Sequence, residues 1–335
     1  MINVGVVGVG YWGPNIIRNF VASNKFSVKI CADLNQKRLD YIHSLYPSIE
    51  TCRDYQDIIK DTSIEVVAIC TPVFTHYEIS RAALEAGKHI LIEKPMTSTS
   101  KESEELVNLA EKKKLVILVD HTFLFTGVVK KIKELIEGGE IGDIYYFDSV
   151  RVNLGLFQHD VNVVWDLAPH DISIMDYLIN RKAESVVATG ADHLGSGLED
   201  VAYVTVYYPE NIIAHIHVNW LSPVKIRQTQ ISGTKKMIVW DDNSPSEKIK
   251  VYDKGIEVIQ TMDQIYNTLI QYRTGDMYCP KIPQTEALAA EIQHFFDCLN
   301  GHEKPISDGY TGYRVVQFLE MSEKSIKNRG KEIKL

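Results

Sequence analysis

The first third of the chain alternates short apolar runs with amphipathic stretches. The apolar runs have the length of buried strands, and the stretches between them carry apolar residues at helical spacing. Strands that alternate with helices at this rhythm predict a parallel, doubly wound α/β sheet. The predicted strands run from Ile2 to the first glycines and over 26–34, 49–52, 65–70, 88–95 and 115–120, with helices over 35–45, 54–61, 76–87 and 101–114.

The pattern changes after Asp120. From Ile144 onward, long runs alternate apolar and polar residues without helices between them, which predicts an antiparallel or mixed sheet with one face packed on helices. Two amphipathic helices close the chain, over 286–301 and 310–328. We therefore expect two domains, an α/β domain over 1–121 and an α+β domain with a large open sheet over 122–335, with a ligand cleft between them.

Three glycines follow the first strand in the pattern Gly8-x-Gly10-x-x-Gly13. In a dinucleotide-binding turn, the first glycine allows the tight turn, the second lets the pyrophosphate approach, and the third lets the helix pack on the strand. The helix N-terminus then offers free N–H groups to the phosphate. Glycines also mark ordinary strand-to-helix turns, but this spacing favours a Rossmann domain over 1–121.

Asp33 ends the second predicted strand, about twenty residues beyond the glycines. A carboxylate there hydrogen-bonds the adenosine ribose hydroxyls and repels a 2′-phosphate, so NAD(H) is favoured over NADP(H). Lys37 and Arg38 follow within a turn and offset part of that repulsion, which leaves NADP(H) open. The alternative is that Asp33 serves as the acid at the start of the next helix.

Charge and cysteine content narrow the class of protein. The 335 residues carry a formal net charge of −8, which argues against a nucleic-acid or membrane partner and favours a small molecule. The five cysteines are widely spaced and form no CxxC pair, which is typical of a reducing compartment. The N-terminus lacks the pattern of a signal peptide, so we expect a cytoplasmic protein. No metal is expected, because His215 and His217 alternate on a predicted strand without a third ligand, and buried packing on one face explains them better.

Lys94 is the first candidate for chemistry. Three stretches reach the carboxyl edge of the predicted sheet, where ligands bind: 8–13, 71–76 and 93–95. A lysine at the end of a buried strand needs a function or a partner. It either bridges the cofactor ribose and a substrate hydroxyl, or pairs with Glu93 or reaches solvent.

Asp166 and His170 form the second candidate. They are four residues apart, so on a helix they face the same side. Pro169 is tolerated in a first helical turn, which predicts a helix start here. A histidine has the pKa to take a proton from a hydroxyl, and a carboxylate can fix its tautomer. The alternatives are that Asp166 is an N-cap and His170 a surface or core residue. We expect Asp171 and Asp176 to serve the helix dipole or solvent.

Four segments together resemble the family of glucose–fructose oxidoreductase, inositol dehydrogenase and rhizopine-catabolism proteins (Gfo/Idh/MocA). They are GVGYWG, the strand end at Asp33, the run CTPVFTHYEISRAALEAGKHILIEKP, and WDLAPHD. The resemblance covers essentially the whole chain. It implies an N-terminal Rossmann domain and a C-terminal domain over 122–335 that binds substrate and commonly forms the oligomer interface, giving a homodimer or homotetramer. The implied reaction is reversible oxidation of a sugar or cyclitol hydroxyl.

The resemblance also assigns roles to single residues. Lys94 matches the lysine of the EKP motif that contacts the nicotinamide ribose and the substrate, and the bond before Pro95 is expected to be cis. His170 matches the acid/base, and Asp166 matches its orienting or substrate-binding partner. The residues expected to bind the cofactor are Gly8, Gly10, Tyr11, Trp12, Gly13, Asp33, Thr71, Pro72, His76, Glu93 and Lys94.

Two departures and one finer likeness complete this picture. Thr71-Pro72-Val73 replaces a TPN triplet and so lacks a side-chain amide, and Pro169 replaces a small residue. The forms WDLAPHD and GYWGPN resemble members encoded with surface-polysaccharide genes, which act on nucleotide-linked sugars. The leading hypothesis is therefore an NAD(H)-dependent oxidoreductase acting on a sugar of the UDP-N-acetyl-hexosamine or hexuronate type.

Two alternatives remain beside it. One is a free-sugar or inositol dehydrogenase. The other is a non-catalytic NAD-dependent sensor, since folds are reused for binding alone. The combination of Lys94, Asp166 and His170 argues against the sensor.

Overall fold

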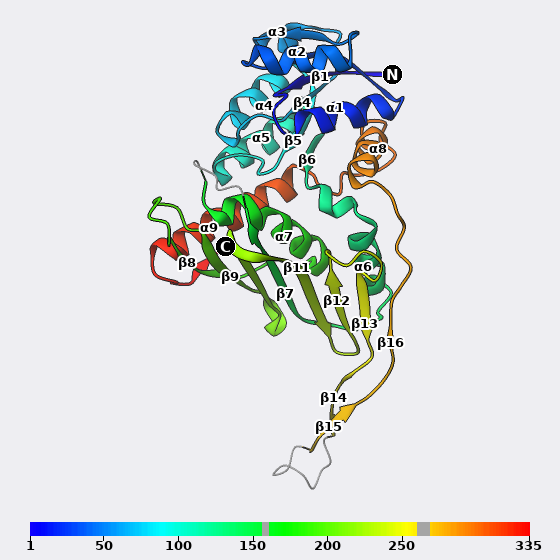
Figure 1. Ribbon diagram of the computed structural model, residues 1–335, viewed down its shortest axis with the longest axis vertical. Helices are drawn as coiled ribbons and strands as arrows, with labels where there is room; N and C mark the ends of the chain where they lie inside the picture. The colour runs from blue at the N-terminus through cyan, green and yellow to red at the C-terminus, as the bar shows by residue number, and fades with distance from the viewer. Residues whose placement is uncertain (156–160, 260–268) are drawn as a thin grey trace. The chain divides into compact units, whose positions relative to one another are not determined.

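The computed structural model describes residues 1–155, 161–259 and 269–335 (Figure 1). The chain forms two compact units. Unit 1 comprises 1–126 and 285–320, and unit 2 comprises 127–284 and 321–335.

Unit 1 contains a six-stranded parallel sheet in the order β3-β2-β1-β4-β5-β6, which confirms the doubly wound Rossmann sheet. Its strands are β1 (Ile2–Val7), β2 (Phe26–Ala32), β3 (Glu50–Cys52), β4 (Val66–Ile69), β5 (His89–Glu93) and β6 (Ile117–Asp120). Its α-helices are α1 (Gly13–Ala22), α2 (Gln36–Leu45), α3 (Gln56–Lys60), α4 (His76–Glu85), α5 (Ser100–Lys113) and α8 (Ala287–Leu299). Short 3₁₀ turns lie at η1 (Val73–Thr75) and η2 (Thr122–Phe125).

Local sequence signals set the ends of several of these elements. Thr99 caps α5 in a reciprocal capping box with Glu102. Gly87 follows α4 with a φ of +79°, a left-handed conformation that glycine adopts without strain. All four residues of β4 are buried, as expected for a central strand of a parallel sheet. The predicted strands and helices of the first 120 residues are thereby confirmed.

Residues 285–320 pack with residues 1–126 in unit 1. The expected division of the chain into 1–121 and 122–335 had assigned them to the second domain. The reason is the apolar face of α8, which packs on elements of the Rossmann sheet. Phe295 on α8 stacks on Phe26 of β2, with ring centroids 6.1 Å apart, and Phe26 in turn packs edge-on against Phe20 of α1. Aromatic rings distant in sequence therefore hold α8 to the Rossmann sheet.

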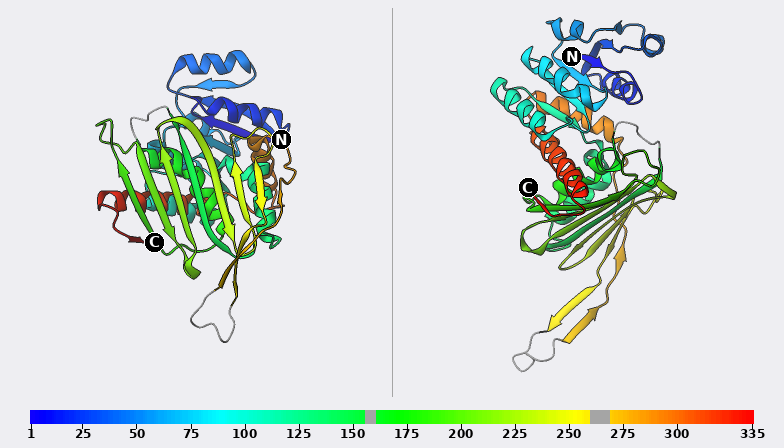
Figure 2. Two further views of the ribbon diagram at one scale, coloured as in Figure 1. Left: turned by 60° about the horizontal axis from the view of Figure 1, so that its bottom comes forward. Right: turned by 90° about the vertical axis from the view of Figure 1, so that its left-hand side faces the viewer.

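Unit 2 contains a mixed nine-stranded sheet in the order β16-β13-β12-β11-β7-β10-β9-β8-β17 (Figure 2). Strands β7 and β10 pair in parallel and the other neighbours pair antiparallel, which confirms the predicted α+β domain. The strands are β7 (Ile144–Leu154), β8 (Ser185–Ala191), β9 (Val201–Tyr207), β10 (Ile213–Asn219), β11 (Leu221–Gly233), β12 (Met237–Asp241), β13 (Ile249–Tyr252), β16 (Met277–Tyr278) and β17 (Ile333–Lys334).

Helix α7 (Val163–Ile179) packs on β7, β9 and β10 and covers one face of this sheet. The remaining elements of the second half are a two-stranded ribbon, a 3₁₀ turn and two further helices, one of which the alternating pattern did not predict. They are β14 (Gly255–Ile259), β15 (Leu269–Arg273), the unpredicted α6 (Gly127–Glu137), the 3₁₀ turn η3 (Pro209–Asn211) and α9 (Gly309–Lys327).

The two histidines of β10 lie on the partly exposed face of the sheet. Ala214, Ile216 and Val218 alternate with them and are fully buried. The ring of Tyr203 stacks on His217 at 4.4 Å and on His215 at 6.0 Å. The sequence predicted that His215 and His217 pack on one face of the sheet, and they do pack against Tyr203. The prediction that they are buried is wrong, because both side chains are partly exposed. Within the described ranges, no group of three or more His, Cys, Asp and Glu side chains is arranged to hold a metal ion.

None of the helices in the described ranges is long and apolar enough to cross a membrane. The five cysteines are free thiols.

Candidate functional site

The turn between β1 and α1 has no room for side chains at two of its glycines. A Cβ atom on Gly8, whose φ is +90°, would lie 2.7 Å from the Cys70 carbonyl carbon and oxygen. One on Gly13 would lie 2.2 Å from the carbonyl oxygen of Gly8. The first turn of α1 contains no acidic residue of its own. This turn fits the phosphates of a dinucleotide.

Asp33 is fixed beside this turn by two backbone hydrogen bonds. It accepts from Val9 N–H at 2.9 Å and from Asn35 N–H at 2.8 Å. The N-cap of α2 is Asn35, which accepts from Lys37 N–H, so Asp33 is not the capping residue. The exposed guanidinium of Arg38 lies 3.9 Å from the Asp33 carboxylate. A fixed carboxylate beside the glycine turn fits the ribose hydroxyls of NAD(H).

His76 joins two loops at the carboxyl edge of the sheet. Its side chain is 1% exposed, and its ring nitrogens lie 2.8 Å from the Thr71 carbonyl and 3.0 Å from the Pro95 carbonyl. Burial lowers the pKa of His76, so the ring is neutral at pH 7 and donates to one carbonyl at a time. His76 thus supports the loops that contain Thr71 and Lys94.

Lys94 directly follows β5, and its bond to Pro95 is cis, as the resemblance implied. Its charge acts on two buried histidines. Burial is the larger cause and the Lys94 ammonium the smaller one in lowering the pKa of His121 to about 3. The same ammonium adds to the lowering at His76. The lysine therefore lies among imidazoles that are neutral at physiological pH.

Helix α7 begins earlier than the sequence suggested. Asn162 is its N-cap and accepts from Val164 N–H at 3.1 Å and Trp165 N–H at 3.2 Å. Pro169 consequently lies inside the helix, so the prediction that it marks the helix start is wrong, as is the alternative that Asp166 is the N-cap. The side-chain cap decides the start, and the helix continues through a residue that lacks an N–H.

Asp166 and His170 lie one turn apart on the same side of α7. The indole of Trp220, which is 2% exposed, donates to Asp166 Oδ2 at 3.0 Å. Trp220 lies between β10 and β11 and was missed in the sequence, where the only signal is a tryptophan at the end of an alternating run. The carboxylate that faces the same side as His170 is thus oriented by a residue far away in sequence.

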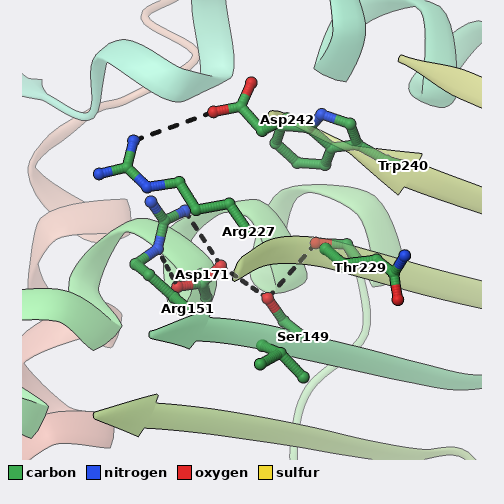
Figure 3. Close-up of a pocket in the computed structure, with 9 residues that line it drawn as sticks. Ser149, Arg151, Asp171, Arg227, Thr229, Trp240 and Asp242 are labelled. Atoms are coloured by element: carbon green, nitrogen blue, oxygen red, sulfur yellow. Dashed lines mark hydrogen bonds and ion pairs between the residues drawn. The ribbon is translucent and has the colours of Figure 1, made fainter. Parts of the chain in front are cut away.

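Asp171, the neighbour of His170, is tied to the sheet of unit 2 (Figure 3). Arg151 on β7 donates to both of its oxygens, at 2.5 and 3.1 Å, and Ser149 donates at 2.7 Å. The side chains of Arg151 and Asp171 are 5% and 2% exposed. The expectation that Asp171 serves the dipole or solvent is wrong, because the residue faces the sheet and not the water.

A second, looser pair lies beside the first. Arg227 on β11 is 3.9 Å from Asp242, and the cavity between the pairs is also lined by Thr229 and Trp240 (Figure 3). Burial, and next the charge of Arg151, lower the pKa of Arg227. Two arginines thus line the same cavity, and each lies within ion-pair distance of one carboxylate.

Residues 2–121 match the sequence model of an oxidoreductase family with an NAD-binding Rossmann fold, GFO_IDH_MocA, and residues 129–239 match the C-terminal domain of the same family. The chain belongs to the Gfo/Idh/MocA family. Residues 2–121 of unit 1 are therefore its NAD-binding Rossmann domain, and the protein is an oxidoreductase. This confirms the family, the enzyme class and the cofactor expected from the sequence.

Individual relatives are similar at modest identity. The UDP-N-acetylglucosamine 3-dehydrogenase of Acidithiobacillus ferrooxidans is 25% identical over 333 residues, 94% of each chain. An uncharacterised oxidoreductase of Bacillus subtilis, YfiI, is 30% identical over 230 residues, and the matched part spans 57% of that protein. The solved structure of a levoglucosan dehydrogenase with NADH and levoglucosan shares the fold, with a TM-score of 0.84 and 21% identity over 99% of both chains.

The buried ion pair of Arg151 and Asp171 predicts that a substitution of Asp171 strongly lowers stability. Asp171→Asn leaves the Arg151 guanidinium buried without its counter-charge, which we expect to lower the free energy of unfolding by about 3 to 5 kcal/mol. Urea denaturation followed by circular dichroism measures this change. Asp176→Asn, on the same helix, is the matched control and is expected to cost less than about 1 kcal/mol. Equal effects of the two substitutions would contradict a special role for the pair.

Proposed function

We propose that this protein transfers a hydride between NAD(H) and a secondary hydroxyl carbon of a sugar, and that the sugar is nucleotide-linked, of the UDP-N-acetyl-hexosamine or hexuronate type used in surface-polysaccharide biosynthesis. The observation that carries the reaction is the pair of Asp166 and His170 on one side of α7, with the carboxylate oriented by Trp220. This arrangement is suited to holding a hydroxyl and moving its proton.

Each proposed catalytic group has one task. His170 removes the hydroxyl proton in the direction of oxidation and returns it in the direction of reduction. Lys94 stabilises the negative charge that develops on the hydroxyl oxygen. Asp166 orients the histidine and contacts the substrate. NAD, when bound, accepts the hydride and supplies the redox chemistry.

Cofactor contacts are proposed for the residues around the glycine turn and the ends of β4 and β5. Gly8, Gly10 and Gly13 let the diphosphate approach the backbone, and Asp33 accepts from the ribose hydroxyls. Its charge favours NAD(H), while the nearby Arg38 offers a cation to NADP(H). Contacts to the cofactor from Tyr11, Trp12, Thr71, Pro72, His76, Glu93 and Lys94 remain part of this proposal.

Support for the nucleotide sugar comes from the relative that matches the chain along almost its full length, a UDP-N-acetylglucosamine 3-dehydrogenase. Two other relatives favour a second candidate, oxidation of a free sugar or cyclitol. They are the NADP-dependent scyllo-inositol 2-dehydrogenase IolW of Bacillus subtilis, 29% identical over 49% of this chain, and a levoglucosan dehydrogenase of Pseudarthrobacter phenanthrenivorans, 30% identical over 58%.

A substrate panel separates these candidates. We expect absorbance at the nicotinamide band to rise when the purified protein and NAD meet UDP-N-acetyl-hexosamines or UDP-hexuronates, and to rise far less with the matching free sugars or inositols. The preference arises because a nucleotide adds binding energy that a free sugar lacks. Equal rates with free sugars would favour the second candidate, and no reduction with any compound would favour a sensor.

Removal of the proposed acid/base should lower turnover without loss of the cofactor. We expect His170→Ala to reduce kcat by about 10² to 10⁴ while the Kd for NADH stays within about twofold. His302→Ala, at an exposed position in unit 1, is the control and should change neither value. If His170→Ala turned over at the wild-type rate, the histidine would have no part in the mechanism.

We propose that the nine-stranded sheet forms the interface of a homodimer or homotetramer. The face opposite α7 exposes apolar side chains on neighbouring strands, with Tyr203 and Tyr207 on β9 and Ile213 on β10. Apolar side chains grouped on one face are typical of an interface. A cytoplasmic location is proposed with it, since the five cysteines are free thiols.

Charge placed on this face should separate the subunits. We expect Tyr203→Glu/Ile213→Glu to shift the mass measured by light scattering after size exclusion to that of one chain, because the added carboxylates would be buried in the interface. Leu45→Glu, at an exposed position on α2, should leave the mass unchanged. A single-chain mass for the wild-type protein would end this proposal.

A further inference from the structure

A buried carboxyl pair lies behind the glycine turn of unit 1. Asp120 is the last residue of β6 and is 2% exposed, and Glu291 on α8 is fully buried. The indole of Trp12, in the glycine turn itself, donates to Asp120 Oδ2 at 2.5 Å, and the Thr122 hydroxyl donates to Oδ1. Asp120 thus connects the start of α1 to the end of the sheet, and the turn η2, which follows β6, packs on α8.

Glu291 is the unusual member of this group. Neither of its carboxyl oxygens has a hydrogen-bond partner among the described residues, although both are completely buried. Burial raises its pKa well above the ordinary value, and the charges of Asp120 and then Glu93 raise it further, while Thr122 lowers it. An ionised carboxylate in this position would pay a large desolvation cost next to a second carboxylate.

The other charges near α8 do not neutralise Glu291. Glu93 lies beside Asp120 in the register of β5 and β6, so the sheet contributes two acids. The Lys94 ammonium, just beyond β5, acts on His121, the residue that follows Asp120. Helix α1 contributes Arg18, which pairs with Glu286 at the start of α8. His294 on α8 itself pairs with Glu303. No described cation is paired with Glu291, so a proton is the group that can balance it.

We propose that Glu291 and Asp120 share one proton, carried by Glu291 and donated to Asp120, and that this singly charged pair positions Trp12 and the first turn of α1 for NAD(H) binding. The bond that forms is Glu291 O–H to a carboxylate oxygen of Asp120, and no other group changes its protonation. Asp120 and Glu291 are positioning residues here, since they act through Trp12. The proposal rests on NAD binding by unit 1 and is independent of the substrate.

The pH dependence of stability tests the shared proton. A carboxyl whose pKa is higher in the folded protein binds more protons when folded than when unfolded, so its contribution to stability falls as the pH rises above the unfolded value of about 4.5. Glu291→Gln cannot titrate. The unfolding equilibrium constant of the wild type, relative to this variant, should therefore rise by up to about tenfold per pH unit between pH 5 and 8.

Glu286→Gln is the matched control, because Glu286 is exposed and its pKa is lowered by Arg18. The ratio of its unfolding equilibrium constant to that of the wild type should stay flat from pH 5 to 8, because a carboxyl with a lowered pKa is ionised in both the folded and the unfolded protein over that range. A ratio for Glu291→Gln that stays constant from pH 5 to 8 would overturn the shared proton.

Cofactor binding tests the positioning role. Titration of the intact protein with NADH, followed by nicotinamide fluorescence, should give a Kd raised about tenfold in Asp120→Asn, because the amide cannot accept from all three donors. Trp12→Phe should give a similar increase, and the double variant no more than either single variant, since both remove the same contact. Glu291→Gln keeps an uncharged donor and should stay within about twofold.

Additive increases in the double variant, or an unchanged Kd in Trp12→Phe, would overturn the positioning role. Trp12→Phe keeps an aromatic ring and both carboxyl groups, so it provides a second measurement if Asp120→Asn fails to fold. Neither measurement involves turnover, and failure of the proposed sugar reaction would leave both results unaffected.

Discussion

The turn between β1 and α1 admits no side chain at Gly8 or Gly13, because backbone atoms lie too close. Cofactor binding by unit 1 depends on this close packing of the backbone. The backbone of the turn lies against Cys70 on one side and against the start of α1 on the other. Because both contacts involve backbone atoms, a larger residue cannot be accommodated by a rotamer change. The helix N-terminus is thereby held at the carboxyl edge of the sheet, where its N–H groups meet an anion.

Side chains support this backbone arrangement from three directions. The Asp33 carboxylate accepts a hydrogen bond from Val9 N–H, and the Trp12 indole donates to Asp120. The His76 ring contacts both the loop after β4 and the loop after β5. Three of these four hydrogen bonds join residues at least 19 positions apart. The edge of the sheet is consequently shaped before any ligand arrives, which lowers the ordering cost of binding.

In unit 2, side-chain contacts fix the rotation of helix α7 about its own axis. Arg151 and Asp171 join α7 to β7 through a buried, two-point ion pair, and Trp220 holds Asp166. A buried ion pair adds little net stability relative to apolar packing, but it penalises any other rotation of the helix, because the charges would then be unpaired. The side of α7 that carries Asp166 and His170 is fixed in this way.

The sequence by itself determined the repeated strands and helices of the first 120 residues, the glycine turn, the alternating strands of the second half and the likeness of WDLAPHD to a known motif. These features follow from local spacing, because the period of the apolar residues and the residue types in a turn depend only on neighbouring positions in the chain. Only the tertiary structure decided that residues 285–320 pack with the first unit and that Asn162 starts α7 ahead of Pro169. It also decided that Asp171 faces Arg151, that Trp12 donates to Asp120, and that Glu291 is buried. Each of these depends on which distant segments share an interior, and burial converts an ordinary carboxyl into a group that needs a specific partner, which local sequence does not specify.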